Sequence, residues 1–266
     1  MAYPAKASDA MKKLLLLNGV LWLLLALPGC TGGAKIILPQ PKPFVPTQSL
    51  AAASDERLAA TLDLVIVRDG PGSWAKNVDW DEYLIRIQNL GGDSIRVTNI
   101  TVLDSLNTRT QIRKNRKELV KGTKQTIRRY KEEGLKVKAG AGLGKMVAGA
   151  GAAAVAGSAL GAAAVGGATA GGMVAAGAVF FVPALAVGGV MRHRTNTRVN
   201  EWIESRQTLL QIVLQEEEEK SLDIFFPLVP SPRQVEITYA DSSGEQTLII
   251  DTRTALEGLH LIQPKE

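Results

Sequence analysis

Cysteine and histidine are nearly absent from this chain of 266 residues, which has one cysteine, Cys30, and two histidines, His193 and His260. A single cysteine excludes a disulfide bond within the chain, so packing alone must hold the fold together. Neither histidine has further ligands at the spacing that metal sites require. We therefore expect no metal site and, because Cys30 has the separate role argued below, no thiol nucleophile.

Recognisable catalytic motifs are missing as well. Residues 139–146 combine glycines with a lysine, as phosphate-binding loops do, but they lack the leading glycine and the Ser or Thr that would hold magnesium. Asp79, Asp81 and Glu82 surround Trp80 just before a strand-like segment, where such a group usually forms a solvated turn. We therefore expect a protein that is not an enzyme and that uses no cofactor.

Charge is absent from a long internal run. Residues 146–191 contain no charged side chain over 46 positions, and Lys145 and Arg192 bound the run. A single helix of this length would reach about 70 Å, more than twice the roughly 30 Å of a bilayer's hydrocarbon core. The run therefore predicts a helical hairpin of two spans whose ends emerge on the same side.

Small residues recur within this run at helical spacing. They are Gly149, Ala153, Gly157, Gly161, Gly167 and Gly171. A face without large side chains lets two helices approach closely, which is how helices associate in lipid. The pattern resembles glycine-zipper membrane domains, a resemblance that implies packing within a bilayer or against other copies of the chain. A hairpin buried in a soluble assembly and an unstructured linker are the two alternatives.

The first thirty residues have the order of a secretory signal. Lys12 and Lys13 precede an apolar run that is too short for a stable span, and small residues precede Cys30. The tetrad Leu27-Pro28-Gly29-Cys30 resembles the lipobox of Gram-negative bacterial lipoproteins. That resemblance implies cleavage before Cys30 and acylation of its thiol, and Thr31 then implies anchoring at the periplasmic face of the outer membrane. A plain signal peptide and an uncleaved anchor are the alternatives.

Strand-like segments occur in two groups that are far apart in the chain. They are residues 61–67, 83–87, 95–102, 208–214, 222–226, 234–239 and 247–250. Neither group can cover its own apolar face, so we expect the two to form one domain. About seven short strands are typical of an immunoglobulin-like β-sandwich. Residues 208–219 could instead form a helix that runs into an acidic stretch, whereas the strand interpretation makes that stretch a hairpin turn.

A strongly basic segment lies between the first strand group and the uncharged run. Residues 109–138 carry twelve bases and three acids, with a thin apolar stripe formed by Ile112, Leu119, Ile127 and Tyr130. This predicts a solvated helix that pairs with residues 192–205 as a stalk beside a membrane, where bases attract anionic headgroups. The expected lipid contacts are Arg128, Arg129, Lys138, Lys145, Arg192 and Arg194. An ordinary charged helix face is the alternative.

These observations predict a mainly β protein with a long helical insertion. The expected parts are a signal peptide (1–29), a lipidated proline-rich tether (30–57), a β-sandwich in two pieces (58–106 and 207–262) and the inserted stalk and hairpin (107–206). We expect an outer-membrane lipoprotein with an assembly or scaffolding role. Its partners would be membrane lipid through acylated Cys30, further copies of itself or another envelope protein, and not nucleic acid. A pore or export channel built from several hairpins is the alternative function.

Overall fold

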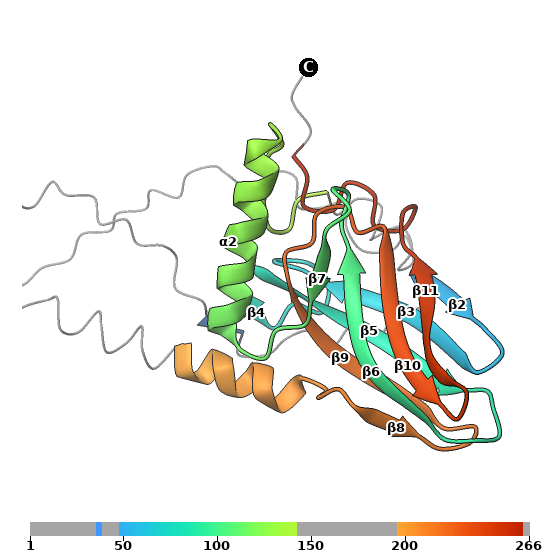
Figure 1. The fold of residues 1–266 in the computed structure, drawn as a ribbon. Coiled ribbons are helices and arrows are strands. Elements are labelled where there is room, and N and C mark those ends of the chain that lie inside the picture. Colours follow the sequence, from blue (N-terminus) through green and yellow to red (C-terminus); the bar gives the residue numbers. More distant parts are fainter. Residues whose placement is uncertain (1–35, 39–47, 143–195, 263–266) are drawn as a thin grey trace, which may run out of the picture. The chain divides into compact units, whose positions relative to one another are not determined.

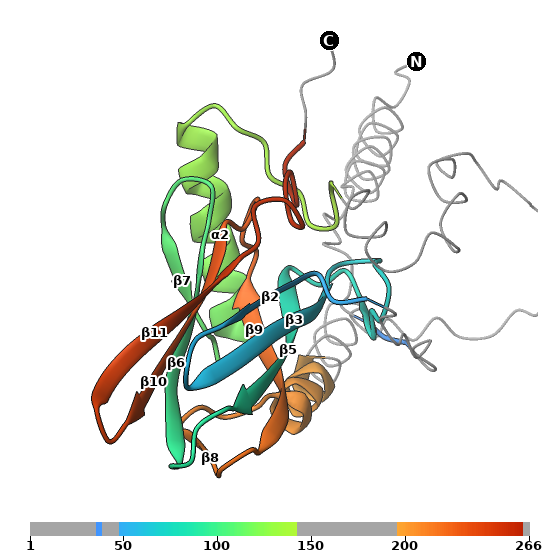
Figure 2. The same cartoon turned by 90° about the vertical axis from the view of Figure 1, so that its right-hand side faces the viewer.

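The computed structural model describes residues 36–38, 48–142 and 196–262, and this part of the chain is mainly β. The strands are β1 (Ile36–Ile37), β2 (Ala51–Ser54), β3 (Leu58–Ile66), β4 (Ala75–Lys76), β5 (Trp80–Asn89), β6 (Ile95–Leu103), β7 (Arg109–Gln111), β8 (Ile212–Leu214), β9 (Glu219–Pro227), β10 (Gln234–Asp241) and β11 (Gly244–Asp251). An antiparallel sheet with the order β2-β3-β5-β9 packs on a second one with the order β11-β10-β6-β7, in which β8 also pairs with β6 (Figures 1 and 2). Together they form a β-sandwich, and β1 and β4 form a separate two-stranded ribbon.

Each of the seven predicted strands overlaps an observed one, and the two strand groups form one sandwich as expected. The segment at 208–214 is a strand only at Ile212–Leu214. The acidic stretch after it is a turn, but it is not the predicted hairpin turn. The chain there passes from β8 in one sheet to β9 in the other, because β8 pairs with β6 whereas β9 pairs with β5.

Alternating apolar side chains build the interior of the sandwich. On β10, Val235, Ile237 and Tyr239 are fully buried, and on β5 the ring of Tyr83 meets that of Phe226 edge-on at 5.1 Å. Each large apolar side chain that is fully buried stabilises the fold by about 1.5–3 kcal/mol.

The basic segment forms helix α2 (Arg116–Glu132), which begins where the side chain of Asn115 accepts a hydrogen bond from the Glu118 amide at 3.0 Å. Its buried residues are Leu119, Gly122, Thr123, Thr126 and Tyr130, and they pack against β9 and β5. The prediction of a helix was right, but the helix is solvated on one face only, because its other face packs against the sheet. Small and hydroxyl-bearing residues complete its buried face. The few bulky apolar residues in the sequence therefore made this face look narrower than it is.

Helix α2 lies close to the sheet at Gly122, where an added Cβ would lie 2.4 Å from Cγ of Pro227. Gly122→Ala should therefore lower the free energy of unfolding by about 1–3 kcal/mol through overpacking. In a helix that does not touch the sheet, the same change would raise stability by up to about 1 kcal/mol. Urea unfolding of both Gly122→Ala and the exposed control Lys121→Ala measures the difference. Stabilisation by Gly122→Ala would contradict the packing of α2 on β9.

Candidate functional site

The two segments that flank residues 143–195 both pack on the outer face of the four-stranded sheet. We call residues 112–142, which include α2, the entry leg, and the helical residues 196–206 the return leg (Figure 1). A second apolar cluster joins them to the sheet. Its members are Trp74, Ala75, Val78, Trp80, Leu119, Val199, Ile203 and Phe225. Helix α2 of the entry leg and the return leg are therefore attached to one face of one domain.

Polar contacts reinforce the attachment of the entry leg. The guanidinium of Arg129 pairs with the carboxylate of Asp104, whose side chain is fully buried and also accepts the Leu106 and Thr108 amides at 2.9 Å. The Tyr130 hydroxyl lies 3.2 Å from the carbonyl oxygen of Pro230, to which it donates, and burial raises the pKa of Tyr130 to about 12. This hydroxyl therefore stays a hydrogen-bond donor throughout the physiological pH range.

A threonine hydroxyl attaches the middle of α2. Thr123 donates its hydroxyl proton to the carbonyl oxygen of Asp79 and accepts the amide of Leu228 at 3.0 Å. The hydroxyl thus joins the ends of two strands, since Asp79 directly precedes β5 and Leu228 directly follows β9. Because leaving a buried polar group unpaired is costly, these hydrogen bonds contribute more to stability than an exposed hydrogen bond would.

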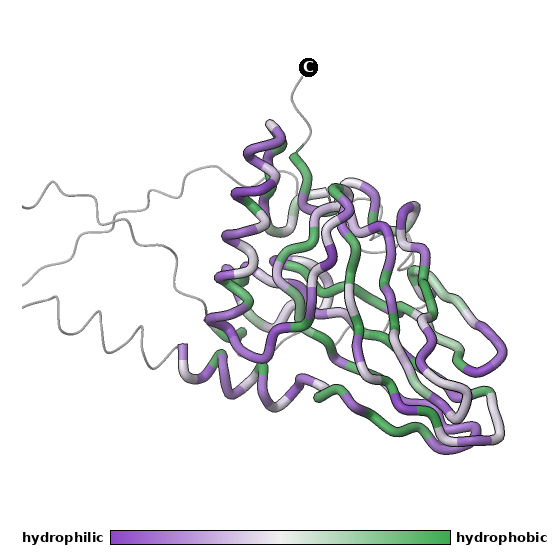
Figure 3. Tube along the Cα trace, in the orientation of Figure 1, coloured by the Kyte–Doolittle hydropathy of each residue, from purple (hydrophilic) through white to green (hydrophobic). Residues whose placement is uncertain are grey.

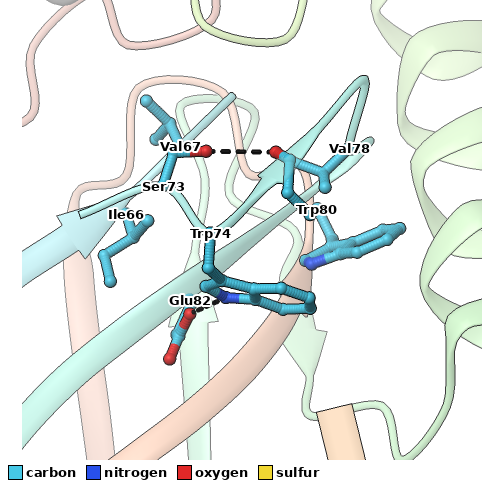
Figure 4. Close-up of a pocket in the computed structure, with 8 residues that line it drawn as sticks. Ile66, Val67, Ser73, Trp74, Val78, Trp80 and Glu82 are labelled. Atoms are coloured by element: carbon cyan, nitrogen blue, oxygen red, sulfur yellow. Dashed lines mark hydrogen bonds between the residues drawn. The ribbon is translucent and has the colours of Figure 1, made fainter. Parts of the chain in front are cut away.

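The return leg is held by a buried carboxylate and a pair of indole rings. Glu82 on β5 is buried and accepts the Arg206 guanidinium at 2.6 Å. It also accepts the Trp74 indole N–H at 2.7 Å (Figure 4). Burial raises the pKa of Glu82 above its ordinary value, and the charge of Arg206 opposes that shift. Trp74 also stacks on Trp202 of the return leg, with ring centroids 5.6 Å apart.

The space beside Trp74 and Glu82 is too small for an organic ligand. Ile66, Val78 and Trp80 are among the residues that line it, and its volume is about 10 Å³. A volume of that size admits at most one water molecule. The cluster around Glu82 is therefore a fastening of the return leg and not a substrate pocket.

A buried histidine fastens the end of the entry leg. His260 Nε2 lies 2.8 Å from Asp81 Oδ2, and both side chains are fully buried. The His260 backbone donates its N–H to the Ala141 carbonyl at 2.8 Å and accepts the Lys138 amide at 2.9 Å. One residue thus connects β5, the carboxyl-terminal segment and the stretch that leads directly into residue 143.

Three buried polar atoms near this pair have no hydrogen-bond partner within the described part of the chain. They are Oδ1 of Asp81, Nδ1 of His260 and the hydroxyl of Tyr83. Burial, and next the charge of Asp81, raise the pKa of Tyr83 well above its ordinary value. Buried polar atoms without a partner lower the stability of the fold. The hydrogen bond between Asp81 and His260 is therefore important for the stability of this region.

The prediction of a solvated turn around Trp80 was wrong. Asp81 and Glu82 are 0% and 1% exposed and lie within β5. Because side chains alternate along a strand, Asp81 points towards the sandwich interior and Glu82 towards the outer face. Sequence reasoning missed them because their partners are distant, His260 by 179 residues and Arg206 by 124. The single signal was the unusual density of acids next to a tryptophan.

The predicted lipid contacts fall into three groups. Arg128 is exposed and forms an ion pair with Glu132 at 3.0 Å, and Lys138 is exposed, with its backbone bonded to His260. Arg129 is directed to Asp104, so its side chain has an internal partner and is only 32% exposed. The others, Lys145, Arg192 and Arg194, lie outside the described residues.

Several predicted features cannot be located in the structure because they lie outside the described residues. These are acylated Cys30 with its signal, most of the tether, the uncharged run 146–191 and the small residues Gly149, Ala153, Gly157, Gly161, Gly167 and Gly171. Among residues 36–38, 48–142 and 196–262, no helix is long and apolar enough to cross a membrane. In the same ranges, no group of three or more His, Cys, Asp or Glu side chains is placed to hold a metal ion.

No protein-family model, no curated protein and no solved structure matches this chain. The fold and the contacts of its two helical legs are therefore the basis for the function proposed below. They define a β-sandwich whose four-stranded sheet carries α2 and the return leg on its outer face.

Proposed function

We propose that this protein is a non-catalytic lipoprotein of the outer membrane, anchored through acylated Cys30, with an assembly or scaffolding role. In this proposal the β-sandwich is a rigid mount for an inserted glycine-zipper hairpin, which enters a membrane or packs with other copies. One observation carries the proposal. Helix α2 and the return leg pack on the outer face of the same sheet through one apolar cluster, and each has a buried ion pair, Arg206 with Glu82 on that sheet and Arg129 with Asp104 in the turn after β6.

The attachment is stronger than a passive linker needs. A flexible insertion requires only exposed, polar ends, because long surface loops are tolerated at small entropic cost. Here the legs bury large side chains, among them Leu119, Val199 and Ile203, and two arginines meet buried carboxylates. Such contacts fix the direction in which the chain leaves and re-enters the domain, which is useful when the insertion must be presented to a partner.

We further propose that the sandwich is immunoglobulin-like. The pairs β5–β9 and β6–β10 correspond to the central pairs B–E and C–F of that fold, with β3 in the place of A and β11 in the place of G. In this assignment the insertion lies between β7 and β9, where strand D would otherwise run. Sandwiches of this architecture are common in extracellular interaction modules, which agrees with a scaffolding role by analogy of fold alone.

A single experiment on the full chain tests the anchor and the hairpin separately. The protein is expressed in a Gram-negative host with radiolabelled palmitate, extracted in mild detergent and sized. The wild type should carry the label and run as an oligomer. Cys30→Ser should lose the label, because the acylated thiol is removed, and Gly157→Leu should lose the oligomer but keep the label, because it fills the small-residue face. Ala159→Leu, on the opposite side of the expected helix, is the matched control and should keep both.

Each readout can fail independently. Label that persists in Cys30→Ser would contradict the lipoprotein anchor. An unchanged oligomer in Gly157→Leu, or equal loss in Gly157→Leu and Ala159→Leu, would contradict the glycine zipper.

A further inference from the structure

One face of α2 carries a row of bases that the contacts with the sheet leave free. Lys117, Lys121, Lys124, Arg128 and Lys131 follow one another at steps of four and three residues, and all five are exposed. The buried residues Leu119, Thr123, Thr126 and Tyr130 repeat in the same steps on the opposite face. We call these five bases the basic row. At 1.5 Å per residue it extends over about 21 Å.

The basic row is not neutralised by its neighbours. Arg128 is the member with an ion pair in the described part of the chain, to Glu132, and that pair is 83% and 62% exposed at its two side chains. Exposed pairs of this kind contribute little. Glu118 is the one acid within the span of the row. Figure 3 shows hydrophilic residues along most of α2.

The chemistry of the basic row suits a diffuse anionic surface. Four of its five members are lysines, which carry compact charges on flexible stems, whereas arginine is the residue that makes fixed, bidentate contacts. The same helix uses Arg129 in that second way, for the buried carboxylate of Asp104. A row of mobile point charges with no aromatic side chain between them fits lipid headgroups better than a defined protein epitope or the bases of a nucleic acid.

Apolar side chains lie beside the row. Ile127 on α2 is 38% exposed, and Leu135, just beyond the helix, is 41% exposed. The exposed Ile262 is bonded through its amide to the carbonyl of Lys136, which brings a third apolar side chain to the same end of the domain. Partly exposed apolar side chains beside bases can enter the headgroup region while the bases contact the headgroups.

We propose that the basic row of α2, together with Ile127 and Leu135, docks the sandwich on a bilayer that contains anionic lipid. This inference deepens the proposed function, because it names the surface by which the mount faces the membrane. Docking would place α2 between sheet and headgroups, with its buried face on β9 and its charged face on the lipid. The negative potential of such a surface attracts every base of the row, so the row can hold the domain on the membrane.

Lysine footprinting of the full-length protein tests this surface directly. The protein is added to vesicles of phosphatidylcholine alone or of phosphatidylcholine with phosphatidylglycerol, and the acetylation rate of each lysine is measured by mass spectrometry. On the anionic vesicles, each lysine of the row should be acetylated at no more than about one tenth of its rate on phosphatidylcholine vesicles. These lysines are Lys117, Lys121, Lys124 and Lys131. Salt at 0.5 M should remove the protection. Lys76 and Lys220, which lie elsewhere on the domain, are internal controls and should react equally on both vesicles.

Charge reversal provides the matched variants. In Lys121→Glu/Lys124→Glu, the protection of the remaining Lys117 and Lys131 should disappear, because the potential of the whole row is lost. Lys76→Glu/Lys220→Glu changes the net charge equally and should leave that protection intact. Fast acetylation of the row on both kinds of vesicle would overturn the proposal. Slow acetylation on both would also overturn it, since it would show that another copy of the chain covers the row.

The footprint is independent of the anchor. It compares two headgroup compositions on a protein that needs no acyl group for the measurement. A wild type without palmitate label would therefore contradict the anchor alone. A missing lysine footprint would contradict the docking surface alone.

Discussion

Replacing His260 with asparagine is expected to lower the free energy of unfolding by about 3–5 kcal/mol, because it leaves the buried carboxylate of Asp81 without its partner. Both side chains are fully buried, and their nitrogen and oxygen atoms lie 2.8 Å apart. Oδ1 of Asp81 already has no hydrogen-bond partner in the described part of the chain, so the carboxylate has no second contact to replace the lost one.

Asparagine is the appropriate replacement because of the backbone at this position. His260 has a φ of 63°, a left-handed conformation that asparagine adopts more readily than alanine. His260→Asn thus removes the imidazole without adding backbone strain, and His260→Ala should be less stable still. Asp81→Asn is the complementary variant. It removes the buried charge and keeps an acceptor for the imidazole, so it should cost less than His260→Asn.

Urea unfolding at neutral pH measures these differences, and hydrogen exchange locates them. Because the His260 backbone is bonded to Lys138 and Ala141, His260→Asn should increase amide exchange at residues 136–142 before the sheets exchange. A loss below about 1 kcal/mol, or unchanged exchange at 136–142, would show that the pair does not hold the end of the entry leg.

The strands could be predicted because their signal is local. In β6, Ile95 and Val97 alternate with the exposed Arg96, and turn-forming residues such as Gly91, Gly92 and Asp93 precede the strand. Alternation and turn chemistry act over a few residues, so they are readable without knowledge of the partner strand. Segments of only two to four residues, such as β2 and β7, are too short to show the pattern.

The attachment of the legs could not be predicted, because it depends on pairs that are far apart in the sequence. Glu82 and Asp81 look like ordinary surface acids until Arg206 and His260 are brought to them by the fold. The buried face of α2 was hidden for another reason. Gly122 and Thr123 score as poor core residues, yet a close approach to Pro227 and a hydroxyl bond are what that contact requires.

Phe225→Ala should be as destabilising as the loss of His260, at about 3–5 kcal/mol, and its effect should be concentrated in the two legs. The ring of Phe225 is fully buried on the outer side of the sheet, in the apolar cluster that includes Leu119 of α2 and Val199 of the return leg. It also meets Trp74 edge-on at 6.5 Å. Its removal opens a cavity where both legs contact the sheet.

The adjacent residue provides a control of equal size on the opposite face. Phe226 is also fully buried, but it belongs to the sandwich interior and contacts Tyr83. Phe226→Ala should therefore lose a similar free energy of unfolding, through the packing between the sheets. Urea unfolding compares the two totals, and hydrogen exchange shows where each variant opens. In Phe225→Ala, exchange should increase first in α2 and at residues 196–206, with the sheets still protected.

The contrast between these two variants tests the central element of the proposed function. If the sandwich is the mount of the insertion, the legs must depend on the outer face and the sheets must survive their release. An increase of exchange throughout the sheets in Phe225→Ala, equal to that in Phe226→Ala, would mean that legs and sandwich unfold as one unit. Unchanged protection of residues 196–206 would mean instead that the apolar cluster does not hold the return leg. Either result would remove the physical basis for a mount that presents the inserted segment in a fixed direction.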